Sequence, residues 1–157
     1  MQKNFPERLY IDSSVLIAYN DENEMHRTNT HKLWRLMDKG LVRLMTSEVA
    51  EDEASRGHEK TRKLFKATFS DVEMILPITK DAIKLADLYI SAGVLTRNHE
   101  DDALHVAVCT LSGLRWLLSW NFHHVKPERS AKFNRVNHLN GLPFVHIVTP
   151  YEYLIQL

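Results

Sequence analysis

Carboxylate side chains recur in three short stretches of the sequence, each beside strongly apolar residues. Asp12 follows the apolar triplet LYI, four acids lie in SEVAEDEASRG (47–57), and Glu100, Asp101 and Asp102 precede the apolar run ALHVAVC. Carboxylates that converge in a fold repel one another unless a divalent cation neutralises them. All-oxygen ligation suits Mg²⁺ or Mn²⁺ rather than zinc. Such a site can activate water and steady a phosphodiester during in-line displacement.

Helical geometry singles out one acid of the second stretch. Ser47 is the natural N-cap there, so the acids after it lie in the first turns of a helix. At about 100° per residue, Glu53 falls between Val49 and Ala50, the apolar pair that should face the sheet. The remaining acids of the stretch fall on the outer side: Glu48, Glu51 and Asp52. Glu53 is therefore the acid predicted to point inward.

The third stretch opens a helix that is apolar over most of its surface, which is typical of a buried helix. Its one polar stripe consists of Asp101, Asp102 and His105, related by i+3 and i+4 spacing, while Glu100 should face solvent. The helix dipole contributes only about 0.3–1 kcal/mol per acid, less than the several kcal/mol that burial of an unpaired carboxylate costs. We interpret His105 as a neutral histidine bonded to Asp101 or Asp102, in preference to a metal ligand.

Asp12 has two interpretations. It can be the N-cap of the helix that begins in SSVLIAY, because aspartate and serine both accept hydrogen bonds from free amides at a helix start. Ser13 or Ser14 could cap that helix instead. Asp12 would then remain at the end of the strand for a metal or a phosphate.

The elements that must position these acids alternate between strands and helices. Short apolar runs predict strands at 8–11, 41–46, 72–78, 115–120 and 144–148. A helix is predicted from the stripe Leu33, Trp34, Leu36 and Met37 to Gly40, and the acidic apolar helix should end at Gly113. Another helix should start at Thr79, end at Gly93 and bury Ala82, Ile83, Ala86, Tyr89 and Ile90.

This alternation predicts an α/β fold with three α/β/α layers around a mostly parallel sheet of about five strands. In open parallel sheets, ligands bind beyond the carboxyl ends of the strands. The acids after the first and second strands and the polar stretch SWNFHH after the fourth all belong at that edge.

Composition supports one globular domain over residues 1–157. The chain has 157 residues with Lys+Arg and Asp+Glu equal at 20 each, so any nucleic-acid-binding surface must be local. Cys109 is the only cysteine, which excludes an intrachain disulfide and favours a reducing compartment. No signal peptide or membrane span is predicted, so we expect a cytoplasmic protein. The nine histidines lack zinc-type Cys/His spacing.

One local basic segment follows the fourth predicted strand. Its side chains are His123, His124, Lys126, Arg129, Lys132, Arg135 and His138, against a single acid, Glu128. Binding of a nucleic-acid phosphate backbone requires such a cluster of basic side chains. A run of charges is equally typical of a helix face exposed to solvent. A weaker basic face runs through Arg27, Lys32, Arg35 and Lys39.

The stretches LYIDSSVLIAY, TSEVAEDEASRG and DDALHVAVCTLSGLRWLLSWNFHHV resemble, in order and spacing, the PIN-domain proteins, especially the VapC-like toxin nucleases. The resemblance covers almost the entire chain and is greatest to a subgroup with WN-x-x-H after the fourth strand. It implies a three-layer PIN fold and Mg²⁺- or Mn²⁺-dependent cleavage of RNA. It also implies a homodimer and, for a toxin of a type II pair, a small antitoxin partner.

Position by position, the resemblance implies catalytic metal ligands at Asp12, Glu53 and Asp102. Many relatives carry a fourth acid after the fourth strand, where this chain has Asn121, and Asp101 could compensate in part. Ser13 or Ser14 would help to hold a phosphate or a metal-bound water, with His105 beside them. The RNA-binding residues would be His124, Lys126, Arg129, Lys132 and Arg135.

Two other functions fit parts of the pattern. Asn121 motivates a non-catalytic PIN-type module that binds RNA or protein. The stretch IDSSV after the first strand suggests a haloacid-dehalogenase-like phosphatase, but such enzymes need a second aspartate where this chain has Ser14.

Overall fold

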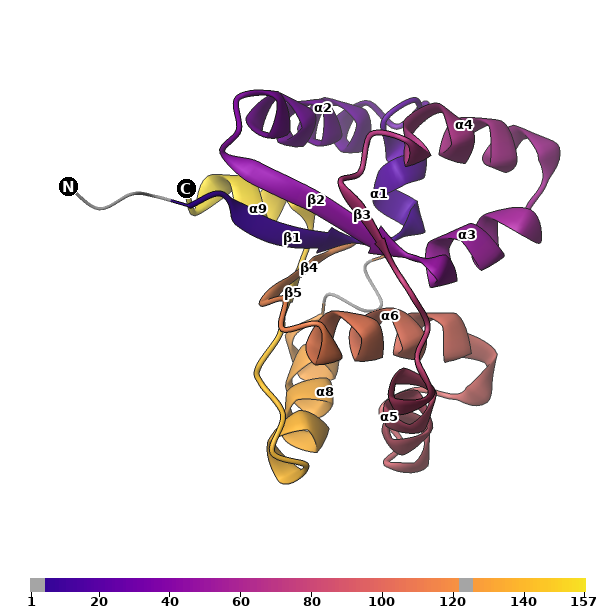
Figure 1. Ribbon diagram of the computed structural model, residues 1–157. Coiled ribbons are helices and arrows are strands. Elements are labelled where there is room, and N and C mark those ends of the chain that lie inside the picture. Colours follow the sequence, from indigo (N-terminus) through magenta and orange to yellow (C-terminus); the bar gives the residue numbers. More distant parts are fainter. Residues whose placement is uncertain (1–4, 122–125) are drawn as a thin grey trace.

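The computed structural model describes residues 5–121 and 126–157, and its centre is a five-stranded sheet (Figure 1). The strands are β1 (Glu7–Ile11), β2 (Val42–Ser47), β3 (Met74–Leu76), β4 (Trp116–Leu118) and β5 (His146–Val148). They pair in the order β3-β2-β1-β4-β5, and all four pairings are parallel. All five predicted strands are present, and the sheet is entirely parallel. β3 ends before Pro77, which has no N–H for the ladder.

Helices cover both faces of this sheet, which confirms the three predicted layers (Figure 1). One face carries α1 (Ser13–Ala18), α2 (Glu24–Asp38), α4 (Glu59–Phe69) and α9 (Pro150–Ile155). The other carries α5 (Lys80–Ser91), α6 (Glu100–Leu111) and α8 (Pro127–Leu139), with the short 3-10 helix η1 (Arg97–His99) before α6. Helix α3 (Glu48–Ser55) follows β2 and contacts α1, α4 and α6.

The core forms two apolar clusters, one on each face of the sheet. Alternate residues of a strand point to opposite faces, so Leu9 and Ile11 pack under α1 and α2 while Tyr10 packs under α6. Both faces of β1 are fully buried at these positions. The end of β1 is thus held rigidly between two helical layers, and Asp12 follows it directly.

The predicted inner face of helix α5 is confirmed for Ala82, Ala86 and Tyr89, with Ile90 partly buried against the core, but it is wrong at Ile83. Thr79 caps it as predicted, but the side of α5 that faces the core consists of Ala82, Leu85, Ala86 and Tyr89. Ile83, predicted to be inside, is 45% exposed. The pattern i, i+3, i+4, i+7 through Leu85 places the stripe one position away from Ile83.

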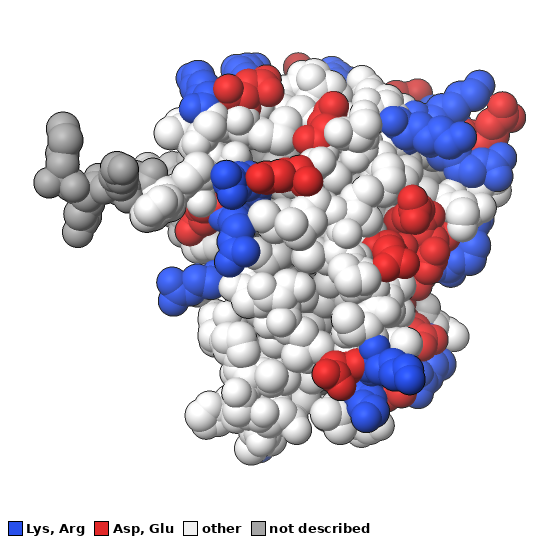
Figure 2. Space-filling view, viewed as in Figure 1, with Lys and Arg blue, Asp and Glu red and all other residues white. Residues whose placement is uncertain are grey.

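Charged side chains of both signs are intermixed on the face shown in Figure 2, with lysine and arginine gathered over α4 at the upper right. This distribution agrees with the net charge of zero. Among the described residues, no helix has the length and apolar character that crossing a bilayer requires.

Candidate active site

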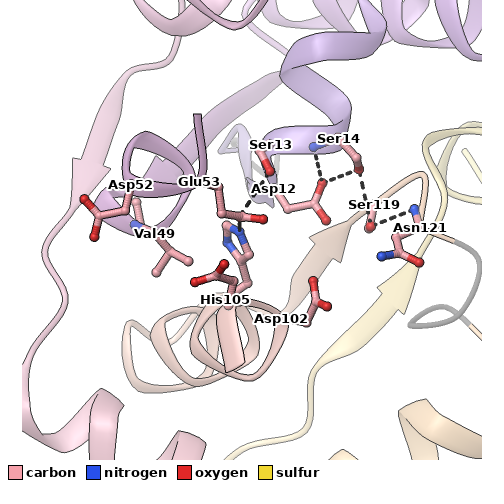
Figure 3. Close-up of polar contacts among 12 residues, drawn as sticks. Asp12, Ser13, Ser14, Val49, Asp52, Glu53, Asp102, His105, Ser119 and Asn121 are labelled. Atoms are coloured by element: carbon pink, nitrogen blue, oxygen red, sulfur yellow. Dashed lines mark hydrogen bonds and ion pairs between the residues drawn. The ribbon is translucent and has the colours of Figure 1, made fainter. Parts of the chain in front are cut away.

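Asp12 lies at the carboxyl end of β1 and is the N-cap of α1, which confirms the capping interpretation. Its carboxylate accepts hydrogen bonds from the Ser14 backbone N–H at 3.0 Å and from the Ser14 hydroxyl (Figure 3). Only 6% of Asp12 is exposed. Capping and a role in chemistry are compatible here, because the cap uses one carboxylate oxygen, Oδ1.

Burial dominates the electrostatics of Asp12 and raises the pKa of its carboxyl group. The positive field of His105 and the hydroxyls of Ser119 and Ser14 lower that pKa in part, while Glu53 adds repulsion. A buried carboxyl with a raised pKa gains from any nearby positive charge. The end of β1 is therefore a favourable place for a cation.

Asp102 and Asp12 line the same small cavity, although they come from α6 and from the end of β1. Its other lining residues are His105, Val106, Leu117, Ser119 and Ile147, and its volume is about 10 Å³. Figure 3 shows Asp102 pointing from α6 towards the end of the sheet where Asp12 and Ser119 lie. The cavity has about the room of one water molecule. The predicted convergence of carboxylates therefore holds for this pair.

Glu53 points inward, towards α6 rather than towards the sheet. Its Oε1 accepts a hydrogen bond from the Ser13 hydroxyl at 3.1 Å and is bonded to His105 Nε2. The Glu53 side chain is 26% exposed, and Asp52 points away from the site as predicted (Figure 3). The structure thus brings Glu53 close to the other site residues, but its carboxylate is hydrogen-bonded to His105 and Ser13.

The expected pairing of His105 with Asp101 or Asp102 is wrong. His105 Nε2 bonds Glu53, and His105 Nδ1 lies 2.6 Å from the hydroxyl of Tyr10, which lies 2.6 Å from the hydroxyl of Ser47. Helical periodicity relates His105 only to residues of its own helix. Its partners come instead from α3, β1 and the end of β2.

The field at His105 connects all three predicted acids. Burial lowers the pKa of the imidazole, but the hydrogen bond and charge of Glu53, with the charges of Asp12 and Asp102, raise it to a net value above the ordinary one. His105 is 3% exposed. The three carboxylates thus favour the protonated imidazole, in contrast to the neutral histidine expected from the sequence.

Asp101 has another partner as well. Its Oδ2 accepts a hydrogen bond from Arg56 Nη2 at 2.9 Å, and both side chains of this ion pair are partly exposed. The expectation that Asp101 pairs with His105 is therefore wrong. Arg56, which sequence reasoning missed, joins the end of α3 to the start of α6.

The segment after β4 closes the site beside Asp12. The Ser119 hydroxyl accepts a hydrogen bond from the Asn121 backbone N–H at 3.0 Å (Figure 3). The Trp120 backbone N–H donates to the Ser14 hydroxyl at 2.9 Å. Ser119 is fully buried and lines the cavity. Sequence reasoning missed Ser119, although its place directly after a predicted strand was a usable signal.

The predicted RNA-binding residues fall on and before α8, except that His124 lies outside the described residues. Lys126 is the N-cap of α8, and Arg129, Lys132 and Arg135 follow on the helix. Arg129 and Lys132 line a second cavity together with His99, whose Nδ1 lies 3.5 Å from Asp102 Oδ2.

Asp12 and Asp102 are the two predicted acids that share a cavity and could hold a divalent cation together. Within residues 5–121 and 126–157, no three histidine, cysteine, aspartate or glutamate side chains are arranged to hold a metal ion. Glu53 stands apart because His105 engages its carboxylate. Mg²⁺ nevertheless commonly binds through one or two carboxylates and completes its shell with water. The small cavity supplies two carboxylates, those of Asp12 and Asp102.

No family model matches the sequence, and no curated protein matches it. Solved structures do match the fold. One is Mycobacterium tuberculosis VapC20, a toxin that cleaves the sarcin-ricin loop, with 17% identity and a TM-score of 0.55, over 88% of this chain and 98% of that one. Another is VapBC2 from Rickettsia felis, solved bound to a DNA fragment from their promoter, with 12% identity and a TM-score of 0.55, over 89% and 96%. These likenesses confirm the predicted PIN-like, VapC-like fold.

Proposed function

We propose that this protein is a metal-dependent endoribonuclease that hydrolyses RNA phosphodiester bonds, with Mg²⁺ or Mn²⁺ as its cofactor. The observation that carries the proposal is the small cavity at the carboxyl edge of the sheet, lined by Asp12 and Asp102. The fold shared with a sarcin-ricin loop cleaving toxin supports it. Ligands of parallel α/β sheets bind at this edge.

In this proposal Asp12 and Asp102 hold the cation, and Glu53 is the third acid of the site. When bound, Mg²⁺ or Mn²⁺ supplies Lewis acidity, which makes a water acidic enough to ionise near neutral pH and offsets charge on the phosphate. Ser14 and Ser119 orient the Asp12 carboxylate.

His105 holds the Glu53 carboxylate from one side, and Ser13 holds it from the other. Because His105 is buried, it excludes water from this side of the group. Glu53 is therefore an oriented carboxylate at the rim of the site, suited to accept a proton from an attacking water.

The toxin role extends the same proposal. We infer an RNA substrate, a small antitoxin as partner, a homodimer and a cytoplasmic location, by likeness to the VapC fold and from the absence of a membrane-spanning helix among the described residues. Because VapC20 cleaves the sarcin-ricin loop, an oligoribonucleotide with that loop is the first substrate to test.

The test compares cleavage of this RNA by wild type, Asp102→Asn and Asp52→Asn in Mn²⁺ and in EDTA. Loss of about 3 kcal/mol of transition-state stabilisation corresponds to about a hundredfold slower cleavage by Asp102→Asn. Asp52→Asn is the matched control because this exposed acid points away from the site. Equal cleavage by wild type and Asp102→Asn would show that the activity is a contaminant.

A non-catalytic module that binds RNA or protein is the second candidate. Two observations favour it: Asn121 lies beside Ser119 where an acid is expected, and the described residues form no three-ligand metal group. This candidate predicts salt-sensitive RNA binding without cleavage in Mn²⁺. Cleavage that Asp102→Asn abolishes excludes it.

A further inference from the structure

We propose that the cavity between the end of α5, η1 and α8 is a nucleotide subsite. It binds the RNA nucleotide adjacent to the scissile phosphate. This inference rests on the proposed function and names the part of the surface that holds the substrate. The cavity has a volume of about 430 Å³, within the range of small-ligand sites. It is lined by Ile90, Gly93, Val94, Leu95, Thr96, His99, Arg129 and Lys132.

The first observation is its position. His99 lines this cavity, and His99 Nδ1 lies 3.5 Å from Oδ2 of Asp102, which lines the proposed cation site. A lining residue of this cavity thus contacts a lining residue of the proposed cation site. An RNA strand with one phosphate at Asp102 has its neighbouring nucleotide within reach of His99.

The second observation is charge. None of the lining residues is acidic, and Arg129 and Lys132 lie at i and i+3 on α8, on the same side of the helix. Within the part of the chain that the structure describes, neither side chain forms an ion pair. The cavity therefore presents two cations available to a phosphate.

One acid of α5 and one acid of α6 pair with Arg97 of η1. Arg97 Nη1 lies 2.7 Å from Asp87 Oδ1 and 3.6 Å from Glu100 Oε1. Arg97 thus offsets one of these two negative charges, and Glu128 in the first turn of α8 is a further acid beside Arg129. Arg129 and Lys132 place two positive charges, which form no ion pair among the described residues, next to a carboxylate cavity, as substrate phosphates on both sides of a cation site require.

The third observation is the mixed lining. Ile90 and Leu95 give the cavity an apolar wall, while Thr96 and the His99 ring are exposed at its mouth. Single-stranded RNA is bound by basic grooves combined with flat or apolar surfaces that accept a base. We therefore expect Arg129 and Lys132 to bind the phosphate of the nucleotide, and the apolar wall with His99 to contact its base. A nucleoside monophosphate can contact both the cations and the apolar wall, whereas inorganic phosphate can contact only the cations.

The binding test uses fluorescein-labelled single-stranded RNA in EDTA, so that cleavage plays no part. Arg129→Glu/Lys132→Glu should weaken binding about tenfold or more at low salt. Thr96→Tyr, which fills the cavity without changing charge, should also weaken it. This variant is safe for the fold because Thr96 makes no side-chain cap bond to η1. The matched control is Lys32→Glu/Lys39→Glu, which reverses two cations in the groove between α2 and α9.

Two results would overturn the subsite: equal weakening by the control pair, or wild-type binding by Thr96→Tyr and the charge-reversed pair, each with an unchanged circular dichroism spectrum. A second measurement adds AMP or inorganic phosphate to ¹⁵N-labelled protein. The subsite requires AMP to shift the amides of Gly93 and Thr96 at lower concentration than phosphate does. Shifts confined to other regions contradict it.

These readouts separate the subsite from the nuclease. If the RNA is never cleaved but the cavity variants lose binding, the proposed activity fails and the subsite stands. If Asp102→Asn abolishes cleavage while Arg129→Glu/Lys132→Glu leaves RNA affinity and KM unchanged, the nuclease stands and the subsite fails.

Discussion

The substitution Tyr10→Phe tests whether the buried hydrogen-bond chain beneath the site stabilises the fold. The Tyr10 hydroxyl lies 2.6 Å from both Ser47 Oγ and His105 Nδ1, and Tyr10 is fully buried. Phenylalanine keeps the ring and removes only this hydroxyl. Ser47 still accepts a hydrogen bond from the Val49 N–H at 3.2 Å, so the main loss falls on His105.

A buried polar atom that loses its partner costs about 1–3 kcal/mol. We take about 2 kcal/mol for Tyr10→Phe, which lowers the Tm of a chain of this length by about 4–8 °C. Urea denaturation followed by circular dichroism measures the change in the free energy of unfolding, and an unchanged m-value shows that the unfolded state is the same.

Tyr153→Phe is the matched control. The Tyr153 ring is also buried, but its hydroxyl donates to Glu7 Oε1, and Glu7 is exposed to water that can replace the lost partner. This substitution should cost less than about 1 kcal/mol. If both variants lose the same free energy, the chain through His105 contributes nothing specific and the reasoning is refuted.

Two further substitutions test the acids of the site. Asp101→Asn removes a partly exposed ion pair with Arg56. It should lower the free energy of unfolding by no more than about 1 kcal/mol and leave RNA cleavage within a few-fold of wild type. A loss of cleavage as large as that of Asp102→Asn would make Asp101 a metal ligand. Asn121→Asp adds a carboxylate beside Ser119 and should bind Mn²⁺ about tenfold more tightly, which raises the Mn²⁺-induced gain in unfolding free energy by about 1.4 kcal/mol at saturation. An unchanged Mn²⁺-induced shift in Tm would place Asn121 outside the cation site.

The fold was predictable because its signals are local. The five strands and the caps at Ser47 and Thr79 follow from periodicity and residue type over a few positions. The inward direction of Glu53 likewise follows from helical geometry on α3. The exposed Ile83 shows the limit of this reasoning, since a stripe can be misplaced by one residue when the face of the neighbouring helix is unknown.

The contacts of the polar side chains were much less predictable. His105 was compared with Asp101 and Asp102 because these are its helical neighbours, yet its hydrogen bonds go to Tyr10 and Glu53. No local pattern indicates that β1 and α3 approach α6 at this point. The pairing of Arg56 with Asp101 depends on the same approach.

The sequence by itself determined that acids gather at one edge of a parallel sheet, because alternating strands and helices place every strand end there. Only the tertiary structure decided which carboxylates lie together and which one pairs with a histidine. Asp12 and Asp102 share a cavity, and Glu53 is bonded to His105. The division depends on distances of a few ångströms between α3, α6 and β1, which are set by packing of the two cores and not by residue spacing along the chain.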